Sequence, residues 1–338
     1  MADQPNHQLG KCLVVGGGGF LGRHIVRQLQ EAGEDVRIFA RHPHPDVSAP
    51  LVQGSILDAE RLGEALRGVD TVFHTASLCE LLRGTRPYWD VNVQGARNVL
   101  DACRATGVKR LIYTSTPSVV IGEQDILDGD ESLPYATRFL SPYPETKAVA
   151  EKLLLEASSD NLRVCALRPH LIWGEDDPHF LPRFIDRAKH HALRIIGTGT
   201  NLVSITHVEN AAHAHLQAAL ELAGKGVCAG HAYFVCDTEP INLWEWANAL
   251  LVRLGLPQAT RRVSHSLAYA LGALNELFCR LPFTGTPVIT RFVANQFAHS
   301  HTFSHASATR DFGYAPVVTP ERGLEAIVAR FGNFTTEP

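Results

Sequence analysis

Short apolar runs and helical patterns alternate along the first half of the chain. Residues 11–15 (KCLVV) form an apolar run that ends in glycines, which is typical of a buried parallel strand. Residues 20–31 repeat apolar side chains at helical spacing, and Gly33 ends this pattern. Further strands are expected at 35–39, 70–74, 110–114 and 163–167, and further helices at 62–66, 91–105 and 144–157. This alternation predicts an α/β fold, a Rossmann-type doubly wound parallel sheet with helices on both faces.

The alternation breaks down after Pro169, where prolines and glycines indicate loops. We therefore predict a Rossmann domain over residues 1–172 and a smaller C-terminal lobe over residues 173–338, interleaved with the last strands of the sheet. This lobe contains the most apolar helical segment of the chain, 266–281 (SLAYALGALNELFCRL). We interpret it as a helix that packs in the core or over an apolar pocket, with peripheral membrane contact as the alternative.

Composition narrows the class of protein. Of the 338 residues, 45% are hydrophobic and 20% are charged, and the net charge of -4 argues against a protein that binds nucleic acid. Seven cysteines at irregular spacing indicate reduced thiols, and seventeen scattered histidines predict no metal site. The first ten residues lack the apolar core of a signal peptide, and no stretch approaches the roughly 20 apolar residues of a spanning helix. We expect a cytoplasmic protein.

A glycine-rich turn follows the first strand and leads directly into the first helix. Its glycines, Gly16, Gly19 and Gly22, have the spacing GxxGxxG, with Phe20 and Leu21 between the last two. Glycine lets the backbone turn sharply and approach a diphosphate, and the helix N-terminus offers free N–H groups to that anion. The strand–glycine–helix order predicts a dinucleotide cofactor.

The residues after the second strand bear on which dinucleotide is bound. A fold that prefers NAD usually places an acid there for the ribose hydroxyls, but this chain has Ala40 followed by Arg41. A guanidinium pairs well with a 2'-phosphate, so the sequence favours NADP over NAD.

Candidate catalytic residues lie downstream of the glycine-rich turn. Tyr143 and Lys147 are four residues apart at the start of a predicted helix, so both lie on one face. An ammonium group near a phenol favours the phenolate and brings its pKa toward the working range. Thr116 follows a predicted strand, where a hydroxyl can orient a substrate oxygen, and Asn92 lies in the helix before that strand.

Together these motifs resemble the extended short-chain dehydrogenases/reductases, and within them the 3β-hydroxysteroid dehydrogenase/isomerase-like family. The similar stretches cover the chain nearly end to end: GGGGFLG (16–22), VFHTAS (72–77), NVQGARNVLDAC (92–103), RLIYTSTPSV (110–119), YPETK (143–147), LRPHLIWG (167–174), ITHVENAAHAH (205–215) and RDFGYAPVVTPERGL (310–324). The combination is specific to the family, although not to one substrate.

The resemblance implies a role for each matching residue. Tyr143 would exchange the substrate proton, Lys147 would tune the phenol pKa and hold the cofactor ribose, and Thr116 and Asn92 would take the supporting positions. Residues implied to line the cofactor are Ser55, Ile56, His74, Ala76 and Pro169. The chain departs from the family pattern in having Val15 for Thr, Ala40 for the ribose-binding acid, and Ser55 for the Asp that bonds adenine.

Two subgroups are most similar, the bacterial 2-alkyl-3-oxoalkanoate reductases of olefin synthesis and the sterol-4α-carboxylate 3-dehydrogenases. Both act on an alcohol or ketone β to a carboxylate on a large apolar body. The resemblance therefore implies an NAD(P)-dependent oxidoreductase for a hydrophobic small molecule. Candidate substrate contacts are Ser118, His170, His179 and Arg183, the last three as carboxylate partners.

Two alternatives stay open at the level of sequence. A nucleotide-sugar epimerase or dehydratase would share the fold and the Tyr–Lys pair, although the apolar C-terminal half argues against a sugar diphosphate. A dinucleotide sensor without catalysis is disfavoured because Thr116, Tyr143 and Lys147 are all present.

Association as a homodimer is a further expectation.

Overall fold

A seven-stranded parallel sheet forms the centre of the molecule, in a computed structural model that describes residues 9–79, 84–178, 180–279 and 289–332. Its strand order is β12-β7-β5-β4-β1-β2-β3, and every neighbouring pair is parallel. The strands are β1 Lys11–Val15, β2 Asp35–Ala40, β3 Leu51–Gln53, β4 Thr71–His74, β5 Arg110–Thr114, β7 Arg163–Pro169 and β12 Ala232–Val235. The apolar runs of the sequence are thus the buried strands of one sheet.

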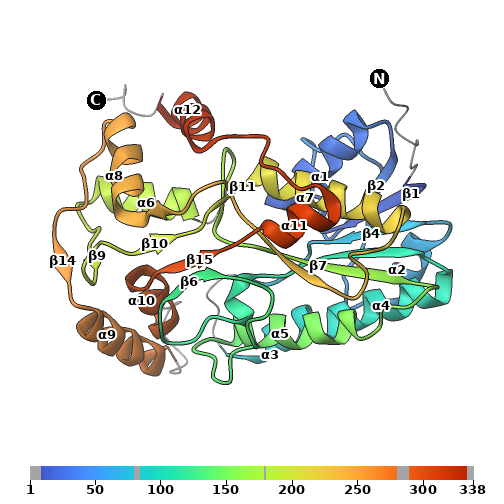
Figure 1. Ribbon diagram of the computed structural model, residues 1–338, viewed down its shortest axis with the longest axis horizontal. Helices are drawn as coiled ribbons and strands as arrows, with labels where there is room; N and C mark the ends of the chain where they lie inside the picture. The colour runs from blue at the N-terminus through green and yellow to red at the C-terminus, as the bar shows by residue number, and fades with distance from the viewer. Residues whose placement is uncertain (1–8, 80–83, 179, 280–288, 333–338) are drawn as a thin grey trace.

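Helices cover both faces of this sheet (Figure 1). On one face lie α1 Phe20–Glu31, α7 Val208–Ala223 and α11 Ala306–Phe312, and on the other α2 Ala59–Leu66, α4 Gly95–Thr106 and α5 Pro142–Leu155. Each layer buries its own apolar core against the strands. The predicted doubly wound α/β class is confirmed.

The predicted helix over 91–105 is interrupted. The chain forms a short α3 Arg86–Tyr88, a π-helical segment η1 Trp89–Gln94, and only then α4. A π-helical turn inserts an extra residue into the helical ladder and redirects side chains, which is why such turns are common at functional sites. Asn92 lies inside this segment, so its side chain does not follow the face that an uninterrupted helix would give it.

A second lobe carries most of the remaining elements (Figure 1). Its small sheets are β13-β10-β15-β6, β11-β8 and β14-β9. The strands of these sheets are β6 Ile126–Gly129, β8 Ile172–Trp173, β9 Ile195–Ile196, β10 Leu202–Val203, β11 Thr206–His207, β13 Ile241–Asn242, β14 Arg262–Val263 and β15 His301–Phe303. The helices are α6 Phe180–Lys189, α8 Leu243–Arg253, α9 His265–Phe278, α10 Arg291–Ala298 and α12 Pro320–Phe331. A 3-10 turn, η2, spans Pro117–Val119.

The two parts exchange segments. β12, α7 and α11 come from the second half of the chain but complete the central sheet, whereas β6 comes from the first half and pairs with β15 in the lobe. The division at 172/173 remains a prediction, because elements cross it in both directions.

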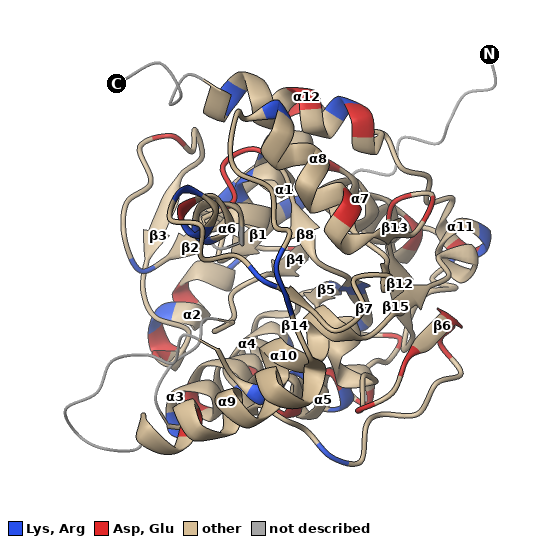
Figure 2. Ribbon diagram, turned by 90° about the vertical axis from the view of Figure 1, so that its left-hand side faces the viewer, with Lys and Arg blue, Asp and Glu red and all other residues tan. Residues whose placement is uncertain are grey.

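The segment 266–281 was interpreted as a core helix, but only one face of this helix is buried and another face is exposed. Ala268 and Gly272 of α9 are buried against α10. The opposite face carries what we call the α9 stripe, five apolar side chains that are 47–59% exposed: Leu267, Leu271, Leu274, Leu277 and Phe278. Figure 2 shows α9 along the outer edge of the molecule. In the part of the chain that the structure describes, no helix is both long and apolar enough to span a bilayer.

Candidate active site

The glycine turn is built so that only glycine fits it. Gly16 has a φ of +88°, and a Cβ on it would lie 2.7 Å from the Ala76 backbone nitrogen. A Cβ on Gly22 would lie 2.2 Å from the Gly16 carbonyl oxygen. The N-cap of α1 is Gly19, which has no side chain to satisfy the first N–H groups of the helix. These residues fit a diphosphate bound at the helix N-terminus, as the sequence predicts.

The other residues predicted to line the cofactor lie at strand ends, in loops and in the first turn of α1. His74 ends β4 and Ala76 follows it beside Gly16, while Pro169 ends β7. Ile56 is buried against Gly95. The remaining predicted residues, Phe20, Leu21, Arg41 and Ser55, lie in the first turn of α1 and in the loops after β2 and β3, and Arg41 is exposed.

Sequence reasoning missed His44. A Cβ on Gly18 would lie 1.8 Å from the His44 imidazole, so this ring covers the glycine turn from the loop that also carries Arg41. The basic run Arg41–His42–His44 was a signal for this proximity in the sequence.

The predicted catalytic side chains meet where β5 ends and α5 begins. The Ser141 hydroxyl caps α5 by accepting a hydrogen bond from the Tyr143 backbone N–H at 3.4 Å. Burial raises the pKa of the Tyr143 phenol above its usual value, and a hydrogen bond with the Thr116 hydroxyl opposes the rise. Thr116 therefore lies near enough to the phenol to affect its pKa, although the two residues are 27 apart in the sequence.

Lys147 lies one turn further along α5 and is buried. Its Nζ donates a hydrogen bond to the Thr114 carbonyl oxygen at 2.5 Å and lies 4.1 Å from the centroid of the Tyr113 ring. Burial lowers the pKa of Lys147 to about 7. Near neutral pH its ammonium and neutral amine forms are therefore both populated.

Two polar residues hold this group in place. The Thr116 hydroxyl accepts from the Ser118 backbone N–H at 3.2 Å and donates to the Ser118 hydroxyl at 3.2 Å, which places Ser118 beside the catalytic group. The Asn92 amide donates to the Thr146 hydroxyl at 3.0 Å and to the Leu78 carbonyl oxygen at 3.1 Å. Asn92 thus ties the loop after β4 to the catalytic helix rather than contacting Tyr143 or Lys147.

The predicted carboxylate contacts separate in space. His170 follows Pro169 at the end of β7 and is buried, while the next residue, Leu171, has a φ of +40°. A leucine in the left-handed region is strained, which is common where a chain presents a functional side chain. Arg183 lies exposed on α6. The prediction for His179 falls outside the described residues.

A second histidine, His301 on β15, accompanies His170 and was missed in the sequence. The two rings are 6.1 Å apart, and His170 also packs against Phe303 at 5.5 Å. Nδ1 of His170 and both ring nitrogens of His301 are buried without a hydrogen-bond partner among the described residues. Burial lowers the pKa of His170 to about 4 and that of His301 to about 3, so both imidazoles are neutral at physiological pH. No local sequence signal links residues 131 positions apart.

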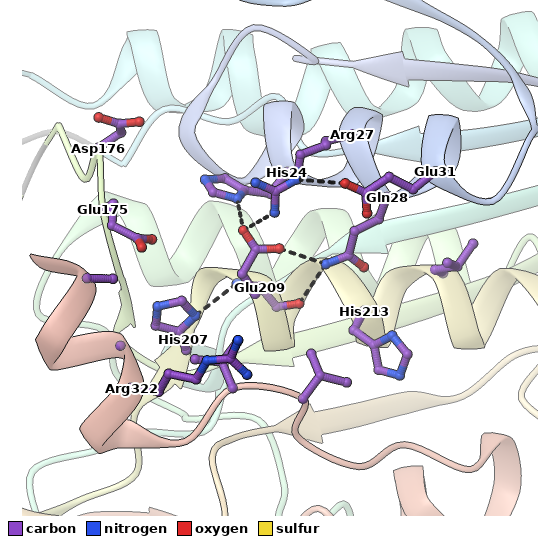
Figure 3. A pocket seen from close by; sticks show the side chains of 15 residues that line it. His24, Arg27, Gln28, Glu31, Glu175, Asp176, His207, Glu209, His213 and Arg322 are labelled. Atoms are coloured by element: carbon purple, nitrogen blue, oxygen red, sulfur yellow. Dashed lines mark hydrogen bonds and ion pairs between the residues drawn. The ribbon is translucent and has the colours of Figure 1, made fainter. Parts of the chain in front are cut away.

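A cavity of about 710 Å³ lies elsewhere, between α1, α7, α12 and the loop after β8 (Figure 3). At its centre Glu209 accepts hydrogen bonds from His24 and Gln28 and pairs with Arg27. These partners outweigh the cost of burial and lower the pKa of Glu209 to about 2. None of the predicted catalytic residues lines this cavity. It is a polar junction between α1 and α7, away from the catalytic group.

Comparisons with known proteins agree with this geometry. A family model described as the 3-beta hydroxysteroid dehydrogenase/isomerase family matches residues 13–265. The chain is 42% identical to the 2-alkyl-3-oxoalkanoate reductase of Shewanella oneidensis, over 94% of this chain and 85% of that protein. It is 36% identical to a 3 beta-hydroxysteroid dehydrogenase/Delta 5-->4-isomerase of Mycobacterium tuberculosis, over 94% and 89% of the two chains. It is also 36% identical to the sterol-4-alpha-carboxylate 3-dehydrogenase, decarboxylating, of Mus musculus, over 95% and 91%.

Solved structures share the architecture. The crystal structure of gox2253 is 25% identical with a TM-score of 0.78, covering 97% of this chain and 99% of that one. MoeE5, solved with UDP-glucose and NAD, is 24% identical with a TM-score of 0.73, covering 97% and 100%. At this identity the second likeness shows the fold alone.

Proposed function

The chain belongs to the 3-beta hydroxysteroid dehydrogenase/isomerase family, and we propose that its substrate is a 2-alkyl-3-oxo acid, reduced to the 3-hydroxy acid. The chain is an NAD(P)-dependent oxidoreductase that acts on hydroxyl and ketone groups, as its relatives are. The observation that carries the proposal is that Tyr143 and the buried Lys147 lie one turn apart on α5, with the Thr116 hydroxyl near enough to affect the pKa of the phenol. The substrate class is supported by two relatives named 2-alkyl-3-oxoalkanoate reductase, which are 42% and 41% identical.

The proposed mechanism follows from these side chains. A nicotinamide dinucleotide held by Gly16, Gly19 and Gly22 would provide hydride chemistry at the ketone carbon. Tyr143 gives its phenolic proton to the ketone oxygen, and the Thr116 hydroxyl orients the same oxygen. The Lys147 ammonium then stabilises the phenolate until a proton returns. In the oxidative direction the proton moves from the substrate hydroxyl to the phenolate.

We assign the substrate carboxylate to the His170 side of the site. The His170 ring packs against Phe303, which stacks on Phe234 at 4.4 Å in an apolar cluster that includes Ala148 of α5. Because burial keeps His170 neutral, it would act as a hydrogen-bond donor to the carboxylate and not as a cation. Ser118 would lie closer to the reacting oxygen. The contribution of Arg183 stays a prediction.

The proposal is tested by following cofactor absorbance with a panel of substrates. We expect turnover of branched 3-oxo acids and oxidation of branched 3-hydroxy acids, with sterol 4-carboxylates slower and plain 3-hydroxysteroids slowest. Methyl esters of the same acids should react poorly, since the buried imidazole would lose its anionic partner. Turnover confined to 3-hydroxysteroids would contradict the substrate class. Interconversion of nucleotide sugars with tightly retained NAD would instead support an epimerase.

We also propose that NADPH is preferred to NADH. The support is Arg41, which is exposed in the loop after β2 at the place where an acid would bind the ribose hydroxyls. In Arg41→Ala, NADPH affinity should fall roughly tenfold, because a charge-assisted hydrogen bond is worth about 1.5–3 kcal/mol before solvent screening. NADH affinity should change little.

The measurement for Arg41 is cofactor titration by fluorescence. Arg253→Ala provides the control, since this arginine is exposed at the end of α8, far from the glycine turn in sequence. An equal loss for both cofactors in Arg41→Ala would mean that this arginine does not read the 2'-phosphate.

For the α9 stripe we propose peripheral contact with a lipid surface. The acid in α9, Glu276, is paired with Arg291 at 2.7 Å, and the exposed Arg261 and Arg262 precede the helix. An apolar face beside exposed cations suits an anionic bilayer surface. Co-sedimentation with anionic vesicles would support this arrangement, whereas a doubled mass without vesicles would assign the stripe to a homodimer.

A further inference from the structure

A buried ion pair lies next to the catalytic lysine and takes no part in the mechanism above. Glu151 of α5 is fully buried, and Arg168 of β7 is 4% exposed. The Arg168 Nε lies 3.0 Å from Glu151 Oε2, and its Nη2 lies 2.6 Å from Oε1. The Tyr135 hydroxyl donates a further hydrogen bond to Oε1 at 2.7 Å. The carboxylate is thus held from two sides in one orientation.

This carboxylate belongs to the same helix face as the catalytic pair. Glu151 follows Lys147 by four residues and Tyr143 by eight, so the three side chains repeat at one-turn spacing along α5. Burial lowers the pKa of Lys147, and the nearby charge of Glu151 opposes that change. An ion pair buried this deeply is weak evidence for stability, because the cost of desolvation cancels most of the attraction. Its place beside Lys147 gives it another use.

Glu151 is the main negatively charged group that acts on Lys147. Arg168 and Lys147 are cations, and the other titratable groups nearby are His74, Cys79, Tyr113, Tyr135 and Lys152. Burial lowers the pKa of His74 to about 3 and raises those of Tyr113 and Tyr135, so these three are neutral at physiological pH. The negative charge of Glu151 is the largest of those that raise the pKa of Lys147, ahead of that of Cys79.

We infer that Glu151, oriented by Arg168 and Tyr135, is a positioning residue that keeps Lys147 charged beside the Tyr143 phenol. The inference rests on the proposed catalytic roles of Tyr143 and Lys147. Glu151 would touch neither substrate nor cofactor. Its effect would pass through the electrostatic potential at Lys147 and Tyr143, so it should alter the pH dependence of turnover more than substrate binding.

Glu151→Gln removes the charge and keeps the shape. Loss of a negative charge favours deprotonation of both Lys147 and Tyr143. Because ketone reduction needs both groups protonated, the alkaline limb of the pH profile of kcat for reduction should move to lower pH, by about one unit. Above the Lys147 pKa this shift lowers kcat roughly tenfold, since one unit changes the charged fraction by that factor. The KM for substrate should stay within about twofold.

Arg168→Met supplies the opposite change. It leaves Glu151 facing Lys147 without the second cation, so the alkaline limb should move to higher pH. The double variant Glu151→Gln/Arg168→Met removes one charge of each sign, so its pH profile should return toward that of the parent. The conservative Glu151→Asp keeps the negative charge, so its profile should stay close to that of the parent. A merely structural role would lower Tm in these variants without displacing the profile in opposite directions.

Two further readouts keep the inference testable on its own. Circular dichroism would show which variants fold. If only one of the two single variants folds, the direction of its pH shift still tests the inference, because the two variants are expected to shift the profile in opposite directions. The Tyr143 phenolate can be titrated by ultraviolet absorbance in the cofactor-free protein, with Tyr143→Phe subtracted. A Tyr143 pKa unchanged in folded Glu151→Gln and folded Arg168→Met would overturn the inference. A parent enzyme without turnover on any 3-oxo acid would instead contradict the proposed substrate and leave this titration interpretable.

Discussion

Tyr143→Phe should lower kcat by about 10²–10⁴-fold, the usual contribution of a positioned acid or base. The phenol lies near Thr116 at the start of α5, one helical turn before Lys147. Phenylalanine keeps the ring and removes the proton that the ketone oxygen needs. Because Tyr143 has no proposed contact with the diphosphate, cofactor affinity should remain close to that of the parent. Rapid-mixing absorbance at saturating cofactor measures the loss.

Tyr233→Phe is the matched control. The Tyr233 hydroxyl donates to Asp311 of α11 at 2.9 Å on the face of the sheet opposite α5, so its loss should cost about 1 kcal/mol of unfolding free energy and leave kcat within twofold. Equal rates for parent and Tyr143→Phe would remove the phenol from the mechanism. Turnover lost together with cofactor binding would point to a collapsed site instead of a missing proton donor.

Gly22→Ala should weaken cofactor binding by two orders of magnitude or more, or prevent folding. The new methyl group would lie 2.2 Å from the Gly16 carbonyl oxygen and 2.8 Å from the Gly17 Cα. Both neighbours are backbone, so the glycine turn itself has to move, and overpacking of this kind costs about 1–3 kcal/mol or more. Cofactor titration and thermal unfolding separate loss of binding from loss of the fold.

Gly63→Ala provides the control for this substitution. Gly63 is also helical, in α2, and a Cβ there meets nothing within 4 Å. Alanine should leave cofactor affinity unchanged and stabilise the protein slightly, since glycine costs about 1 kcal/mol inside a helix. If Gly22→Ala binds the cofactor as the parent does, the diphosphate does not lie on this turn.

The sequence predicts those parts of the fold that local signals determine. β1, α1 and β5 match their predicted bounds because glycine and apolar periodicity mark both ends of each element. The helix over 91–105 was placed correctly but without its π-helical start, since nothing in local periodicity distinguishes the two helical ladders. β12 and α7 lie beyond Pro169, where the alternation weakens, and their place in the central sheet depends on contacts with distant residues.

In the candidate site, too, some residues could be predicted from local sequence and others could not. The Tyr143–Lys147 pair follows from helical spacing, and the contact with Thr116 follows from the meeting of strand ends at one edge of a parallel sheet. Glu151 with Arg168 and His170 with His301 could not be predicted, because each pair joins side chains from separate elements. The exposed leucines of α9 illustrate a different limit, since apolar character does not show whether a partner covers it.

The exchange of β12 and β6 between the two parts of the molecule restricts how this enzyme can be re-engineered. A chimera made by grafting another protein's C-terminal half after residue 172 would also replace one edge strand of the central sheet and the α7 layer packed on α1. It would leave β6 beside a foreign strand in place of β15. New substrate preferences should therefore be sought by changing pocket side chains within the intact chain, because the halves do not behave as interchangeable modules.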